Sequence, residues 1–71
     1  MPQLLICIDN AGYEAALERR KIYVALSDPA ALHEGLVRVV DESGQDYLYP
    51  RERFIAAELP TATQQAVIQA S

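Results

Sequence analysis

The sequence predicts a mainly β protein: a small five-stranded antiparallel barrel with one short helix and a C-terminal tail. Short apolar or β-branched segments follow one another along the chain, separated by Gly, Pro, Asn and Asp turn signals. The chain has 71 residues, 51% of them hydrophobic and 23% charged, which is the composition of one small globular domain. Closing such a sheet into a barrel also removes exposed strand edges.

The first strand is predicted over Leu4–Ile8, an apolar run that is too short for a helix and is followed by turn residues. Tyr13–Lys21 contains helix formers but lacks a strong N-cap, so we expect an irregular or extended segment with at most one helical turn. In the next predicted strand, Lys21–Leu26, β-branched, aliphatic and aromatic side chains alternate between the two faces. This alternation places Ile22, Val24 and Leu26 on one face and Tyr23 on the other.

One short helix follows over residues 29–34. Asp28 or Ser27 is its expected N-cap, Pro29 suits the first helical position, and Gly35 ends it.

The second half of the domain begins with the strand Leu36–Asp41, a polar loop and the strand Tyr47–Tyr49, which together predict a hairpin. The alternation places both tyrosines on one face and Leu48 on the other. Pro50 ends the pairing because it has no backbone N–H. A tight turn at residues 51–53 then leads into the last strand, Phe54–Leu59.

Residues 1–59 are therefore predicted to form the barrel domain, and residues 60–71 a flexible tail or short helix. Thr61 is the expected cap of that helix. An isolated helix of this length is marginal in water, so we expect order only if Val67 and Ile68 dock on the domain.

Two parts of the chain resemble a group of small uncharacterised bacterial proteins. The first part is Asn10–Glu18 followed by Lys21–Tyr23, and the second is His33–Pro50. The resemblance covers about residues 3–59 and implies a Src-homology-3-like barrel with no established biochemical function. Leu48–Ile55 is also similar to the strand, proline, 3₁₀ turn and last strand of Src-homology-3 adaptors. Their groove for polyproline ligands also needs a Trp. This sequence has no Trp, which argues against a polyproline ligand.

Nothing in the sequence predicts an enzyme, a cofactor or a metal site. Cys7 is the only cysteine and His33 the only histidine, and neither belongs to a nucleophile–base or metal-ligand motif. We expect Cys7 to be structural and His33 to lie at a helix end. Asp41, Glu42 and Asp46 predict a solvated turn, because the loop is too short for a calcium site. The apolar runs are too short for a membrane helix or a signal peptide, so we expect a cytoplasmic protein.

The leading hypothesis is a non-enzymatic module that binds another protein or itself. Two tyrosines beside a proline make a rigid contact patch if they lie on the outer wall. The expected partner surface comprises Tyr47, Tyr49, Pro50 and Arg51, with Tyr13 and Tyr23 as neighbours. The alternative, that some of these tyrosines fill the core, stays open because large core residues are scarce.

The second hypothesis is weak binding of single-stranded nucleic acid through a basic and aromatic surface. Its candidate residues are Arg19, Arg20, Lys21, Arg51 and Arg53. The net charge of −4 argues against it, because phosphate affinity grows with the number of engaged cations.

Overall fold

A computed structural model describes residues 3–70 of the protein. Met1, Pro2 and Ser71, which belong to the predicted domain and tail, lie outside the described residues. The elements in chain order are β1 (Gln3–Cys7), β2 (Ile22–Leu26), α1 (Pro29–His33), β3 (Leu36–Val40), β4 (Asp46–Pro50), the 3₁₀ turn η1 (Arg51–Arg53), β5 (Phe54–Ala56) and α2 (Thr61–Gln69).

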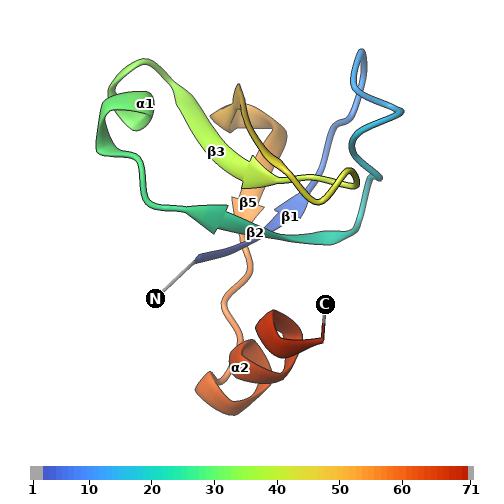
Figure 1. Ribbon diagram of the computed structural model, residues 1–71, viewed down its shortest axis with the longest axis vertical. Helices are drawn as coiled ribbons and strands as arrows, with labels where there is room; N and C mark the ends of the chain where they lie inside the picture. Colours follow the sequence, from blue (N-terminus) through green and yellow to red (C-terminus); the bar gives the residue numbers. More distant parts are fainter. Residues whose placement is uncertain (1–2, 71) are drawn as a thin grey trace.

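The strands form one antiparallel sheet that curls into a half-barrel, in the order β4-β3-β2-β1-β5 (Figure 1). This confirms the mainly β, five-stranded antiparallel prediction. Within residues 3–70 no pairing joins β4 to β5, so the predicted closure of the sheet into a barrel is not confirmed. The last strand is also shorter than predicted, because it ends at Ala56.

The concave face of the half-barrel holds the hydrophobic core. Its buried residues come from every strand and from the loop between β1 and β2; they are Leu5, Cys7, Leu17, Tyr23, Ala25, Val37, Val39, Tyr49 and Phe54. Leu17 is the loop's contribution and is fully buried. The predicted irregular segment therefore supplies a core residue, although it forms only turns.

The faces of two strands differ from the simplest sequence interpretation. On β2, Ile22 and Val24 share a face, but that face is the outer one and they are half-buried. Tyr23 and Ala25 enter the core, where they lie opposite Leu5 and Val39 of the neighbouring strands. Only one face of each strand points into the half-barrel, and on β2 that face carries Tyr23.

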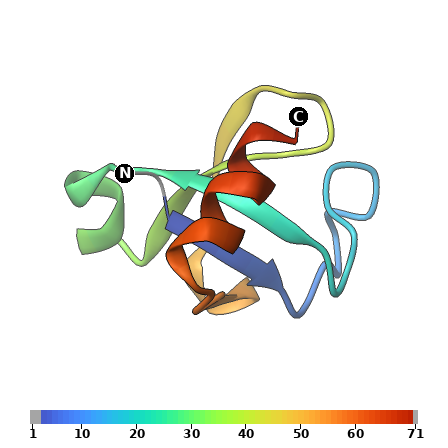
Figure 2. The same ribbon diagram turned by 90° about the horizontal axis from the view of Figure 1, so that it is seen from below.

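Helix α2 lies across the outer face of β1 and β2 (Figure 2). Leu4 points to this face, because its neighbour Leu5 points into the core, and yet Leu4 is only 2% exposed. Val67 and Ile68 of α2 are half-buried and line a hollow with Ile22. Val67 and Ile68 therefore contact the domain, which is the condition that the sequence set for an ordered helix in this tail.

The predicted cap of α2 is wrong. Thr61 is already the first helical residue, Pro60 precedes it, and no side chain bonds the first-turn amides. Within residues 3–70, neither α2 nor α1 has the length and apolar character needed to cross a membrane.

Candidate functional site

The expected partner surface is not intact, because two of its tyrosines are in the core. Tyr49 and Tyr23 are each 5% exposed, whereas Tyr47 is 51% exposed. Tyr47 and Tyr49 do share a face of β4, as predicted, but it is the concave face. Leu48 is the residue that points outward, at 42% exposure. Of the two alternatives left open by the sequence, the structure shows the one in which some of the tyrosines, Tyr49 and Tyr23, fill the core.

Tyr49 is fixed by a buried carboxylate. Its hydroxyl donates to Asp41 Oδ2 at 2.5 Å, and Ser43 donates to Asp41 Oδ1 through both its amide and its hydroxyl. Burial alone would raise the pKa of Asp41, but the hydrogen bonds from Ser43 and Tyr49 outweigh it and lower that pKa. Asp41 was expected in a solvated turn. It is only 7% exposed, and no local pattern in the sequence points to its partner Tyr49, eight residues away.

Tyr23 is fixed by the next carboxylate. Its hydroxyl donates to Glu42 Oε2 at 2.5 Å and accepts from the amide of Glu18 at 2.7 Å. Lys21 Nζ lies 2.6 Å from Glu42 Oε2, and this contact lowers the pKa of Glu42. Glu42 also donates its amide to Ala16 O. The β3–β4 hairpin is thereby tied to the loop that follows β1.

Tyr13 is occupied by contacts of its own. Its ring meets Tyr49 edge-on at 5.2 Å between centroids, and the Arg53 guanidinium lies 5.5 Å from its centroid. Arg53 Nη1 is 2.9 Å from Asp9 Oδ1, although the buried Nη1 atom makes no well-directed hydrogen bond. Tyr13 and Arg53 therefore stabilise the loop more than they offer a free surface.

The structure does not bring the candidate nucleic-acid residues together. Lys21 and Arg53 are held by carboxylates. Arg19 and Arg20 line a hollow beside Ile8, at one end of β1, whereas Arg51 lines a cavity with Gln3 at the other end. No single face gathers the five cations.

Cys7 and His33, the two residues whose chemistry could suit catalysis, lie in different environments. Cys7 is fully buried in the core, and burial raises the pKa of its thiol. His33 is exposed at the end of α1. Among residues 3–70, no three His, Cys, Asp or Glu side chains are grouped closely enough to hold a metal ion.

What remains accessible of the expected surface lies along β4 and η1. Tyr47 and Arg51 are exposed and Pro50 is half-buried, and Leu48 joins them as an exposed residue on the opposite face of β4. The accessible set is therefore Tyr47, Leu48, Pro50 and Arg51.

No protein-family model, curated protein or solved structure matches the chain. Its function must therefore be inferred from its own residues and geometry.

Proposed function

We propose that the chain is a non-enzymatic protein-interaction module of the Src-homology-3-like barrel type, which takes an extended segment of a partner protein onto the free edge of β4. Two features support the barrel type: the strand order β4-β3-β2-β1-β5 and the 3₁₀ turn between β4 and β5. The observation that carries the binding proposal is the β4 edge itself, which combines free backbone groups with exposed apolar side chains.

The hydrogen bonds at the two ends of the β3–β4 ladder show which backbone groups are free. Asp41 donates to Gln45 O, and Arg51 donates to Gly35 O. In an antiparallel ladder such pairs recur at every second residue, so Tyr47 and Tyr49 bond to β3. Asp46 and Leu48 then direct their N–H and C=O groups away from the sheet, and Pro50 directs its C=O there. An added strand pairs with such groups.

The edge strand carries one exposed apolar side chain on its outer face, Leu48, which begins a row that runs inward across the sheet. Leu48 is in register with Arg38, which is in register with Leu26, and both leucines are exposed. Arg38 is held by two carboxylates, with Nε 2.9 Å from Asp28 and Nη1 2.9 Å from Asp46. Because its charge is paired, Arg38 adds little electrostatic cost when an apolar side chain of the guest packs beside Leu48.

The edge is also short and bounded, which suits a specific contact. Pro50 has no N–H to offer and Asp46 carries a charge, two devices that limit uncontrolled edge pairing. The free length is that of β4, five residues. A second copy of the chain meets the same requirement as an extended guest, so self-association is measured alongside partner binding.

The experiment uses Leu48→Pro. The Leu48 N–H is not needed for β3, so proline there should block strand addition and leave the fold in place. A photo-crosslinking residue at position 47 would first identify the partner in cells, and sedimentation velocity would detect a homodimer. We expect Leu48→Pro to weaken the interaction at least about tenfold, the loss of roughly one or two hydrogen bonds and a leucine contact.

The matched control is Ile8→Ser, which removes another exposed apolar side chain away from β4. It should bind the partner as the wild type does. Equal affinity of Leu48→Pro and the wild type for the cross-linked partner would contradict the proposal. Salt-sensitive binding of single-stranded RNA, measured by fluorescence anisotropy, would instead favour the nucleic-acid hypothesis.

A further inference from the structure

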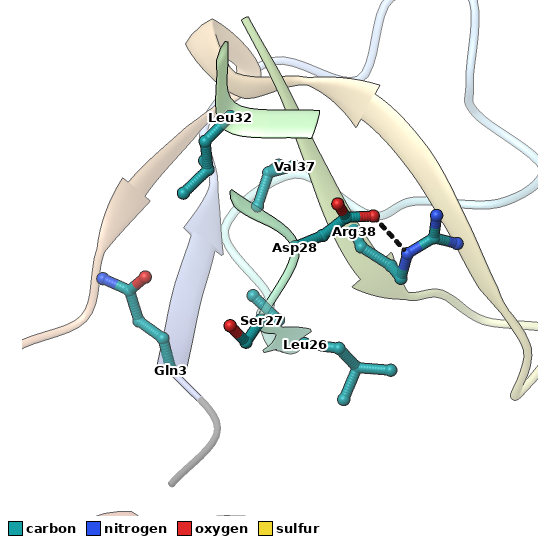
Figure 3. Close-up of a pocket in the computed structure, with 8 residues that line it drawn as sticks. Gln3, Leu26, Ser27, Asp28, Leu32, Val37 and Arg38 are labelled. Carbon is teal, nitrogen blue, oxygen red and sulfur yellow. Dashed lines mark hydrogen bonds and ion pairs between the residues drawn. The ribbon is translucent and has the colours of Figure 1, made fainter. Parts of the chain in front are cut away.

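A cleft opens at the end of the half-barrel beneath α1. It consists of two adjoining cavities of ≈ 240 and ≈ 250 Å³, which share Gln3, Leu32 and Val37 in their walls. Leu32 extends from α1 toward the first of these cavities and is 47% exposed (Figure 3). The shared wall residues make the two cavities neighbours, so together they reach from the β2–α1 connection to β5.

The cavity beside β5 is apolar with one charged wall. Leu5, Leu32, Val37, Phe54 and Ala56 form the apolar part. Arg51 is the cation. The cavity's volume of ≈ 250 Å³ is enough for one branched aliphatic side chain of a ligand.

Arg51 differs from the other cation of the cleft. Arg38, in the first cavity, is paired with Asp28 and Asp46. Arg51 is exposed and has no carboxylate within ion-pair distance among residues 3–70. An unpaired guanidinium beside an apolar cavity is complementary to an apolar group that carries a carboxylate.

β5 offers backbone groups beside the same cavity. Ile8 donates to Arg53 O and Ala57 donates to Leu4 O, so Ile55 is the β5 residue that bonds to β1. Phe54 and Ala56 therefore direct their backbone groups to the free edge. The Phe54 N–H is already bonded to Arg51 O, which leaves Phe54 C=O and both groups of Ala56.

We infer that this cleft binds an extended peptide whose apolar side chain fills the cavity beside β5 and whose carboxylate pairs with Arg51. The peptide adds to β5 through Phe54 C=O and the two groups of Ala56. Arg51 precedes β5 in the chain, so a guest whose carboxyl end reaches Arg51 runs antiparallel to β5. This site uses the β5 edge, whereas the first proposal uses the backbone groups of the opposite edge, β4; Arg51 lies in the turn between the two strands.

The test is a nuclear magnetic resonance titration of the ¹⁵N-labelled full chain with acetyl-Thr-Val-Thr-Leu as the free acid. Saturable shifts are expected at the Ala56 amide and around Leu32, with a dissociation constant of about 1 mM or lower. The same peptide as the C-terminal amide should bind about tenfold more weakly, the loss of one charge-assisted pair. A third peptide, acetyl-Thr-Val-Thr-Leu-Asp-Ser amide, tells an acidic side chain from a chain terminus as the source of the carboxylate.

Two variants with the same change of charge make the result specific. Arg51→Gln should remove the preference for the acid, whereas Arg19→Gln, at the other end of β1, should keep it. Leu48→Pro should leave this titration unchanged, so failure at the β4 edge and failure here are distinguishable. Equal binding of acid and amide, an unaltered preference in Arg51→Gln, or no saturable shift at Ala56 with any of the three peptides would overturn the inference.

Discussion

Two tyrosines that are two positions apart on β4 have opposite roles. Tyr49 meets Tyr13 and Phe54 edge-on and donates to the buried carboxylate of Asp41. Tyr47 points to the same side of the strand but lies closer to the hairpin loop, where its hydroxyl meets only the exposed Gln45 at 3.2 Å. Position along the strand, more than the face, decides which tyrosine the core uses.

Phenylalanine substitutions separate these roles. Tyr49→Phe removes a donor to a buried carboxylate and should lower the free energy of unfolding by about 1.5–3 kcal/mol. Tyr47→Phe should change it by no more than about 0.5 kcal/mol, because the hydroxyl is exposed. Urea denaturation followed by circular dichroism measures both. Similar losses in the two variants would contradict the placement of Tyr49.

At the level of elements, α1 is short and depends on its N-cap residue, Asp28. Asp28 Oδ1 accepts from the Ala31 amide at 3.1 Å, and Asp28 Oδ2 accepts from Arg38 Nε at 2.9 Å. These contacts lower the pKa of Asp28, and the hydrogen bond from the Ala31 amide contributes most. One side chain thus begins the helix and fastens it to β3, and α1 in turn carries Leu32 over the cleft.

Asp28→Ala should lower the free energy of unfolding by about 1 kcal/mol, the usual value of an N-cap. Asp28→Asn keeps a cap and loses the ion pair, so it should cost less. Asp46→Ala removes only an exposed partner of Arg38 and should cost about 0.5 kcal/mol or less. Thermal unfolding of the three variants gives the order. A loss in Asp46→Ala as large as in Asp28→Ala would mean that the ion pairs, not the cap, are what matters.

The sequence allowed the elements to be predicted better than their contacts. Turn chemistry identified the strands, the helix after Asp28 and the 3₁₀ turn after Pro50, because these signals are local. The face of β4 could not be predicted, because Leu48 and Tyr49 are both apolar enough for a core. The burial of Asp41 depends on a hydroxyl eight residues away, and the cleft depends on where α1 lies over the sheet. Both are tertiary facts without a local signature.

For the whole molecule, the hydrogen bonds between tyrosines and carboxylates make the free energy of unfolding depend on pH in both the acid and the alkaline range. The pKa values of Asp41 and Glu42 are lowered by hydrogen bonds and by Lys21. Their contribution is present above the ordinary carboxyl pKa of about 4 and is lost as the pH falls through the depressed values. Burial, followed by the bonded carboxylates, raises the pKa of Tyr23 and Tyr49. Their contribution is present below the ordinary tyrosine pKa of about 10 and is lost at higher pH.

We therefore expect a stability plateau between about pH 5 and pH 9, with a fall on each side. Urea midpoints measured across this range and beyond it would show the two limbs. Glu42→Gln should flatten the acid limb, and Tyr49→Phe should flatten the alkaline one. Unchanged limbs in both variants would show that other groups control them.

The position of β1, between two strands that lie far apart along the chain, has a consequence for biosynthesis. β1 bonds to β2 on one side and to β5 on the other, and the second pairing joins Leu5 to Ala56 across most of the chain. The β2–β3–β4 segment is local and can assemble early, whereas the β1–β5 pairing must close a long loop. β1 is translated before its second partner exists. Leu4–Ile8 is thus an apolar strand with an open edge until the ribosome has released β5, and it is the segment of a nascent chain most exposed to wrong pairing.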